Sequence, residues 1–147
     1  MKNAFLILIF FVLTQCGFEP IFSSKEVNFK IKKIESNKKI EIIENRLTNL
    51  INADPKFFYN LVIDYSESKT TLSKDSQGKS LLLRIKIKIN LKVIENDKVL
   101  LKKDYFSNFD YQNLDKKFEL SEYENEIRKN MFDEIANKIL IDLIDLK

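Results

Sequence analysis

The chain is poor in the residues on which much enzyme chemistry depends. It has no histidine and no tryptophan, one cysteine, two glycines and two prolines among 147 residues. Without histidine, the commonest general base is missing. A lone cysteine excludes an internal disulfide, and no glycine-rich phosphate loop or cluster with metal-ligand spacing occurs. We therefore expect a binding or assembly protein, not an enzyme, with no catalytic residue, no metal and no cofactor.

The charges of the chain nearly balance, with 25 basic and 22 acidic residues. A dedicated nucleic-acid binder usually carries a strongly basic domain. We therefore expect no nucleic-acid partner. Because 44% of the residues are apolar, one compact domain held by its hydrophobic core is expected.

The N-terminus holds an apolar run from Ala4 to Leu13, preceded by Lys2. It is shorter than the roughly 20 residues that span a bilayer as a helix, and it is typical of the apolar region of a signal peptide. Cys16 follows where a small residue normally marks the cleavage site. In bacterial lipoproteins such a cysteine is lipidated and becomes the new N-terminus. The pattern predicts cleavage between Gln15 and Cys16 and a covalent lipid on Cys16.

Two other interpretations of Cys16 stay open: an uncleaved signal anchor with an incidental cysteine, and a secreted protein with an unpaired thiol. Gln15 is bulkier than the small residue usual before a lipidated cysteine, whereas Leu13 fits the lipoprotein pattern. The preferred division is a lipoprotein signal peptide over 1–15, a lipidated N-terminus and tether over 16–24, and a single α/β domain over 25–147.

Hydrophobic periodicity predicts four strands and two helices. The polar stretch 66–80 is predicted to be a long loop or a ragged hairpin end, and Asn96-Asp97 a tight turn. Ser121 and Glu124 resemble a capping box at the start of the last helix. In chain order, the predicted elements are a strand around 27–31, a helix over 37–52, strands over 59–65, 81–95 and 98–109, and a helix from 121 onward.

This order predicts an α+β fold, β-α-β-β-β-α. Both helices need an apolar surface, and one face of a sheet supplies it. We expect a two-layer sandwich, with a four-stranded, mainly antiparallel or mixed sheet and the two helices packed on one face.

A row of cations is the first candidate site. It consists of Arg84, Lys86, Lys88 and Lys92, which share one face of the strand over 81–95 because side chains alternate along a strand. We call these four residues the basic ladder; Lys30, Lys32 and Lys102 are expected to join it. The ladder is either a contact site for anionic groups or the ordinary solvated face of a one-sided sheet.

Aromatic residues mark the second candidate site, a partner contact. Tyr105 and Phe106 are adjacent, so both cannot face the core of a regular strand. The exposed one, with Phe109 and Tyr111 nearby, suits an interface. A strand bulge or the packed rim of the core is the alternative.

The opening of the mature chain resembles the LptE family of lipopolysaccharide-assembly lipoproteins. That family begins with Cys-Gly-Phe, a variable residue, Pro and an apolar-aromatic pair. The resemblance continues through NRLTNLI, YNLVIDYSES, the long lysine-rich hairpin and the final helix SEYENEIRKNMFDEIANKI. The matching residues of the opening are Cys16, Gly17, Phe18, Pro20, Ile21 and Phe22.

The resemblance implies a helix-on-sheet sandwich anchored to the outer membrane by its lipid, with the domain on the periplasmic side and within a partner barrel. Gly17 agrees with outer-membrane sorting, since aspartate at that position commonly retains lipoproteins at the inner membrane. The implied partners are an LptD-like β-barrel, which such proteins plug and help to assemble, and lipopolysaccharide, whose delivery to the outer leaflet they assist. The alternative is an accessory lipoprotein of general β-barrel assembly. Under this resemblance the basic ladder is expected to contact lipopolysaccharide or the barrel lumen.

Overall fold

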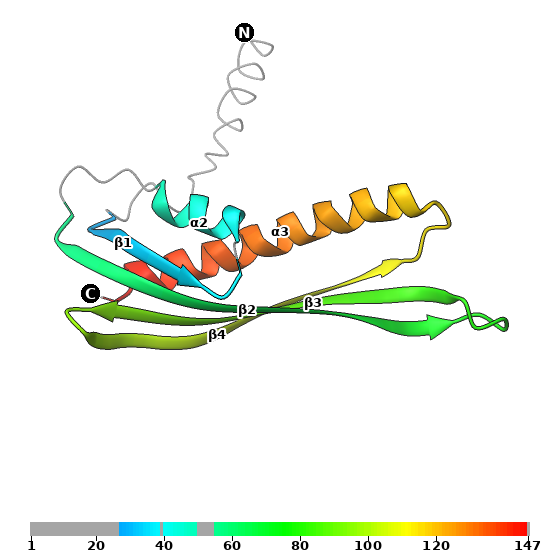
Figure 1. Cartoon of the computed structure of the whole chain (residues 1–147), viewed down its shortest axis with the longest axis horizontal. Helices are drawn as coiled ribbons and strands as arrows, with labels where there is room; N and C mark the ends of the chain where they lie inside the picture. Colours follow the sequence, from blue (N-terminus) through cyan, green and yellow to red (C-terminus); the bar gives the residue numbers. More distant parts are fainter. Residues whose placement is uncertain (1–26, 39, 50–54, 147) are drawn as a thin grey trace, which may run out of the picture.

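The chain folds into one four-stranded sheet with two helices on one of its faces (Figure 1). This computed structural model describes residues 27–38, 40–49 and 55–146. The α+β order β-α-β-β-β-α is confirmed. The elements are β1 (Phe29–Ser36), α2 (Glu41–Thr48), β2 (Phe57–Lys74), β3 (Ser80–Glu95), β4 (Lys98–Gln112) and α3 (Lys117–Ile144).

The sheet is mixed, as one of the two predicted arrangements required. Its spatial order follows the sequence, β1-β2-β3-β4. β1 and β2 are parallel, and α2 lies in the connection between them. The other two pairings are antiparallel hairpins. β1 and β4 are therefore the two edges of the sheet.

The alternation in β3 explains the one-sided packing. Its odd-numbered residues from Leu83 to Val93 are buried beneath the helices, whereas the even-numbered residues lie on the opposite face. A strand that alternates in this way has one face for the core and one for water. We call the side without helices the open face. The fully buried side chains of the core include Leu61, Ile63, Ile85, Ile87, Ile89, Leu91, Ile135, Ile139 and Leu143.

β2 is much longer than the sequence pattern predicted. Of the two alternatives for 66–80, the long loop is wrong, because β2 continues to Lys74 and pairs with β3 from Asn60 onward; the segment is the end of a hairpin, with register shifts between Thr71 and Lys74. The actual turn is short: Asp75 Oδ1 accepts the backbone N–H groups of Gln77 and Lys79, both at 2.9 Å, and Gly78 has φ +83°. The predicted turn at Asn96-Asp97 is confirmed, with φ values of +47° and +65°.

Both helices begin at residues other than those predicted. Asn37 does not start α2, because its side chain pairs with the backbone of Tyr65, accepting the N–H at 2.9 Å and donating to the carbonyl at 3.1 Å. The end predicted for that helix, at Asn52, lies outside the described residues. α3 begins at Lys117, ahead of Ser121, and no side chain caps it. The capping box is therefore wrong.

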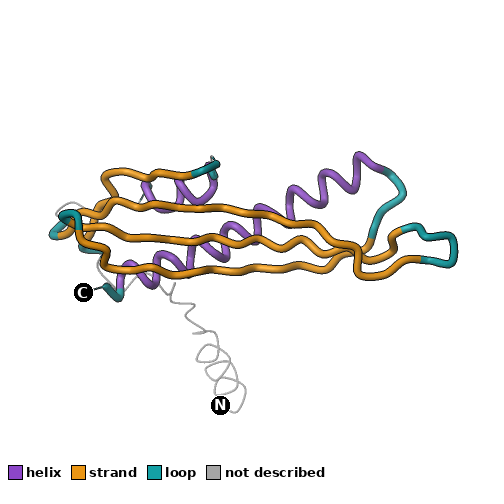
Figure 2. The backbone as a smooth tube through the Cα atoms, turned by 60° about the horizontal axis from the view of Figure 1, so that its bottom comes forward, coloured by secondary structure: helices purple, strands orange, loops and turns teal. Residues whose placement is uncertain are grey.

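α3 crosses the sheet obliquely (Figure 2). Its first half is bonded to both β2 and β4: Arg128 Nε donates to Glu67 Oε1 at 2.9 Å, and the Tyr111 hydroxyl donates to Glu124 at 2.7 Å. Its last half reaches β4, where Asp142 pairs with Lys103 at 2.7 Å. Between these two ends the Ser107 hydroxyl donates to Glu134 at 2.8 Å, so α3 contacts β4 along most of the strand.

Candidate functional site

The basic ladder lies on the open face, on the central strand β3. Arg84, Lys86, Lys88 and Lys92 alternate with the buried odd-numbered residues of the strand. Lys102 lies on the same face, directly opposite Lys92 on β4. Lys30 also lies there, opposite Phe58 on β2, and Lys32 Nζ lies 4.5 Å from the centre of the Phe58 ring. The structure thus brings all the predicted cations to one face.

Two residues of the basic ladder, Arg84 and Lys88, form ion pairs with carboxylates on β4. Arg84 donates two hydrogen bonds to Asp110, at 2.6 and 2.7 Å. Lys88 pairs with Asp104 at 3.1 Å, and Asn90 donates to the same carboxylate. These bonds hold the pKa of each aspartate below its usual value; the main causes are the Arg84 hydrogen bond for Asp110 and the Asn90 and Lys88 hydrogen bonds for Asp104. Both pairs are exposed to solvent, so their contribution to stability is small.

Lys86 and Lys92 complete the ladder, and within the described part of the chain they form no ion pair. Lys92 faces another cation, Lys102. Like charges directly opposite each other across two strands are unfavourable. An external anion bound near this pair would relieve the repulsion, which makes the Lys92 end the most anion-receptive part of the ladder.

Phe106 adds an aromatic surface to the open face. It lies opposite Lys88 and is 47% exposed. The ammonium groups of Lys86 and Lys88 lie 5.6 and 5.3 Å from its ring centre, within range of a cation–π interaction. Of the adjacent pair Tyr105 and Phe106, Phe106 is the exposed member, as strand alternation requires.

The other predicted contact aromatics lie on the helix-covered face. Tyr105 is buried, and its hydroxyl donates to Asp142 at 2.5 Å. Burial, with the bond to Asp142, raises the pKa of Tyr105. Tyr111 is also buried. Phe109 is 43% exposed, although Ser107 and Tyr111 on the same face are buried and bonded to α3. Phe106 and Phe109 therefore lie on opposite faces of one strand.

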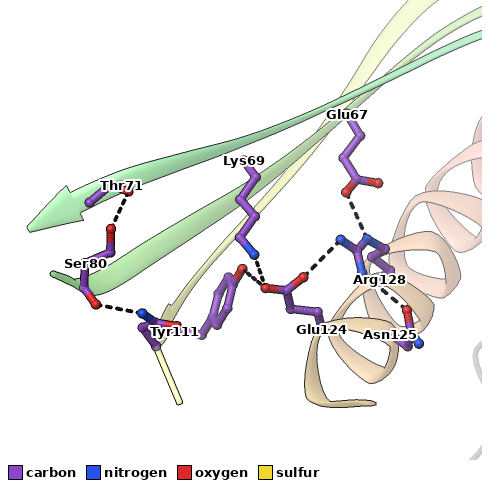
Figure 3. Close-up of polar contacts among 9 residues, drawn as sticks. Glu67, Lys69, Thr71, Ser80, Tyr111, Glu124, Asn125 and Arg128 are labelled. Carbon is purple, nitrogen blue, oxygen red and sulfur yellow. Dashed lines mark hydrogen bonds and ion pairs between the residues drawn. The ribbon is translucent and has the colours of Figure 1, made fainter. Parts of the chain in front are cut away.

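The sequence patterns did not predict an ionic network that surrounds one buried glutamate (Figure 3). Its centre is Glu124, which is only 7% exposed. One carboxylate oxygen accepts from the Tyr111 hydroxyl at 2.7 Å and from Lys69, and the other accepts from Arg128 at 3.3 Å. Arg128 also pairs with Glu67, so the network joins β2, β4 and the first half of α3.

The pKa values in this network follow from burial and hydrogen bonding. Burial acts to raise the pKa of Glu124, but the bonds from Lys69, Tyr111 and Arg128 outweigh it and lower the value. The pKa of Tyr111 is raised by burial and by its bond to Glu124. Glu124 thus stays ionised at neutral pH and acts as a structural tie between sheet and helix. The signal that could have found it is a glutamate in register with the buried stripe of the last helix, three residues before Ile127.

Two predicted features lie outside the described residues. These are Gln15 and Cys16 of the cleavage and lipidation site, together with the whole of the signal peptide and tether. Among the helices that the structure describes, none combines the length and apolar character needed to cross a membrane.

Comparison with solved structures decides which proteins share this architecture. The chain superposes on rare lipoprotein B from Shewanella oneidensis with a TM-score of 0.61 and 17% identity, covering 79% of this chain and 94% of that one. A minor lipoprotein from Acinetobacter baumannii gives 0.61 and 12%, covering 81% and 92%. Lipoprotein B from Nitrosomonas europaea gives 0.60 and 15%, covering 84% and 88%. The chain shares the fold of bacterial lipoproteins.

These lipoproteins match over most of their own length, so the likeness covers whole domains. Identities of 12–17% show the fold alone. No family model matches the chain, and no curated protein matches its sequence.

Proposed function

We propose that this chain is an LptE-like lipoprotein of the outer membrane. Its Cys16 carries the lipid anchor, and its domain pairs with an LptD-like β-barrel as plug and assembly partner. In that complex it assists the binding of lipopolysaccharide and its insertion into the outer leaflet. The observation that carries the proposal is the fold shared with bacterial lipoproteins in a chain that has a cysteine directly after a signal-like apolar run.

The open face supports a polar or anionic partner. A face of a sheet that lacks helices and carries aligned cations suits both the phosphates of lipid A and the polar wall of a barrel lumen. Because Arg84 and Lys88 are held by carboxylates of the same chain, Lys86 and Lys92 are the cations best placed to engage an external anion.

Partner identity is tested by isolating the lipidated chain from outer membranes and identifying the proteins that accompany it by mass spectrometry. A single, very large barrel is the expected partner. A multiprotein barrel-assembly complex would instead support the alternative, an accessory lipoprotein of general barrel assembly. A Cys16→Ser variant, which cannot be lipidated, serves as the control for membrane attachment.

Lipopolysaccharide contact is tested with a Lys86→Glu/Lys92→Glu variant. Its binding to purified lipopolysaccharide is expected to fall, with the largest difference from wild type at low salt, because salt screens exposed charges. The matched control is Lys117→Glu/Lys129→Glu, which makes the same charge change on the exposed surface of α3. If the two variants fold and bind lipopolysaccharide with equal affinity, the open face is excluded as the lipid site. The remaining interpretation is then that the basic ladder contacts the barrel lumen.

A further inference from the structure

A groove lies between the two helices, where α2 and α3 pack against each other (Figure 1). It is a hollow of about 590 Å³, with walls formed by α2 and by the second half of α3. One ion pair, from Arg46 to Asp133 at 3.5 Å, joins the two walls. Hollows that hold ligands in proteins have volumes of roughly 300–1,000 Å³, so this one is large enough for several side chains. We call it the interhelical groove.

Apolar side chains from three parts of the chain line the interhelical groove. Leu140 and Ile144 of α3 are 6% and 5% exposed, whereas Ile42 of α2 and Val27, ahead of β1, are only partly buried. Ile42 thus differs from the next residue, Ile43, which is fully buried in the core. Covering the remaining apolar surface would remove it from water, which is favourable. The groove therefore favours an occupant that brings apolar side chains.

Three asparagine side chains border the same groove. Asn45 and Asn49 are one turn apart on α2, and Asn137 lies on α3. Within the described part of the chain, none of these three amides has a hydrogen-bond partner. Each amide carries a donor and an acceptor, and an extended peptide backbone offers the complementary groups at nearly every residue.

The polar lining excludes other kinds of occupant. A hydrocarbon chain would leave the asparagine amides unpaired as it covered them. An anion would find the one cation of the groove, Arg46, already paired with Asp133. The chemistry of the interhelical groove therefore fits an extended peptide with apolar side chains.

The chain supplies such a peptide immediately before the groove. Val27 lines the groove and is the first residue that the structure describes. Residues 17–26, which we call the N-terminal segment, precede it with the sequence GFEPIFSSKE. The large apolar residues of this segment are Phe18, Ile21 and Phe22. They are of the kind that the groove favours.

The length of the N-terminal segment matches the length of the groove. Phe22 lies five residues before Val27, so an extended chain carries it about 16 Å away at roughly 3.3 Å per residue. The wall of α3 from Asp133 to Ile144 is eleven residues long, which is also about 16 Å at a rise of 1.5 Å per residue. Ile21 and Phe22 can therefore reach any part of the groove without displacing Val27.

Covalent attachment favours the N-terminal segment over a separate protein. A peptide joined to its site by a few residues is present there at an effective concentration of about 1 mM. A separate protein at about 1 µM would have to bind roughly a thousandfold more tightly to compete on equal terms. Among possible peptides, the segment attached to Val27 is therefore the favoured occupant.

We infer that the N-terminal segment of the chain occupies its own interhelical groove. In this arrangement Ile21 and Phe22 cover Ile42 and Leu140, and the backbone of the segment pairs with the asparagine amides. The inference goes beyond the proposed function, because the seating needs neither a barrel nor lipopolysaccharide.

The seating has a consequence for the membrane anchor, and this consequence alone rests on the proposed lipid. Cys16 is six residues before Phe22, so a lipid on Cys16 is held within about 20 Å of the groove. The stretch 16–24 then fixes the domain close to the membrane surface instead of acting as a flexible tether.

Disulfide trapping in the full lipidated chain, held in detergent, tests the position of the segment. Phe22→Cys is combined with Asn137→Cys on the wall of the groove. The matched control combines Phe22→Cys with Lys138→Cys, the next residue of α3, which lines a separate hollow beside β4. A disulfide needs Cβ atoms about 3.5–4.5 Å apart, so it is expected to form roughly tenfold faster with Asn137→Cys than with Lys138→Cys.

The state of Cys16 is measured separately. Intact-mass analysis before oxidation shows whether Cys16 carries its lipid, in which case the introduced cysteines are the only free thiols. If the lipid is missing, Cys16→Ser removes the remaining thiol and the trapping proceeds. A failed lipid anchor and a failed seating are therefore distinguished.

Amide hydrogen exchange of α2 gives an independent measurement. Phe22→Ser removes an aromatic ring from the groove and is expected to speed exchange of the α2 amides roughly tenfold, because the helix loses part of its cover. The matched control is Phe118→Ser, the same substitution at a residue that is 75% exposed in the first turn of α3. It is expected to leave exchange in α2 unchanged. Circular dichroism confirms that each variant folds.

Two results overturn the inference. Equal rates of disulfide formation with Asn137→Cys and Lys138→Cys would show that the segment has no preference for the groove. Exchange in α2 that Phe22→Ser leaves unchanged, in a folded chain, would show that this residue does not cover the helix and that the groove is open to another protein. Neither result bears on the barrel partner, which the isolation from outer membranes tests by itself.

Discussion

Replacing the buried Glu124 with glutamine removes one charge from the centre of its ionic network and preserves the shape of the side chain. The amide oxygen can still accept the Tyr111 hydroxyl, now at 2.7 Å from the carboxylate. What is lost is the charge that pairs with Lys69 and Arg128. Glu67 still neutralises Arg128, so Lys69 is the residue that loses its carboxylate.

The expected cost is about 2 kcal/mol of the free energy of unfolding at neutral pH. Hydrogen bonds to charged groups contribute roughly 1.5–3 kcal/mol each when buried. The side chains of Lys69 and Arg128 are 40% and 26% exposed, and water therefore replaces part of the lost interaction. Urea denaturation followed by circular dichroism measures the difference. Tyr111→Phe, which removes one hydrogen bond to the same carboxylate and leaves its charge and both cations in place, is the comparison and is expected to cost about 1.5 kcal/mol.

The pH dependence gives a second, independent check. The pKa of Glu124 is lowered in the folded chain from an ordinary value of 4.5. Its stabilisation is therefore fully present above that value and is lost as the pH falls through the lower folded pKa. The gap between wild type and Glu124→Gln should narrow below about pH 4.5. A gap under about 0.5 kcal/mol at neutral pH, or one that stays constant on acidification, would refute the proposed role of the charge.

Three further predictions concern the sheet. Ile87→Ala should lower the free energy of unfolding by about 3–4 kcal/mol, measured by urea denaturation, because the side chain is fully buried; a loss below about 1 kcal/mol would contradict its place in the core. Asn37→Ala should cost about 1 kcal/mol and speed amide exchange at Tyr65, since both side-chain bonds end there; unchanged exchange would argue against that bond. Gly78→Ala should lower the thermal midpoint, by about 1 kcal/mol in stability, because φ is +83° although no atom lies within 4 Å of the added carbon; a stabilised variant would exclude this turn conformation.

The elements that could be predicted are those whose own residues alternate between apolar and polar along the strand. β3 alternates apolar and basic residues over its full length, so both its conformation and its buried face follow from the sequence. The distal half of β2 has no such alternation, because its residues from Ser66 to Lys74 are exposed. Its extended conformation comes from pairing with β3, a tertiary contact that local patterns do not contain.

The candidate sites likewise include features set by one strand, which could be predicted, and features set by contacts between elements, which could not. The ladder was predictable because its members share one strand. The carboxylates of Asp104 and Asp110 that engage it depend on the register of β3 and β4, which the sequence does not specify to the residue. Glu124 was assigned to a helix cap because it follows Ser121 by three residues. That spacing cannot reveal that the helix begins earlier and that the glutamate is buried.

The connectivity of the sheet also bears on how it assembles. β2, β3 and β4 follow one another through tight turns, so their contacts close short loops and can form early. β1 is attached by one parallel ladder to the first seven residues of β2, Phe57 to Ile63, and lies at an edge. Its ladder can open while the three-stranded meander and α3 remain folded. Hydrogen exchange of the β1 amides should therefore report this partial opening. Hydrogen exchange of the β3 amides should instead report the unfolding of the whole domain.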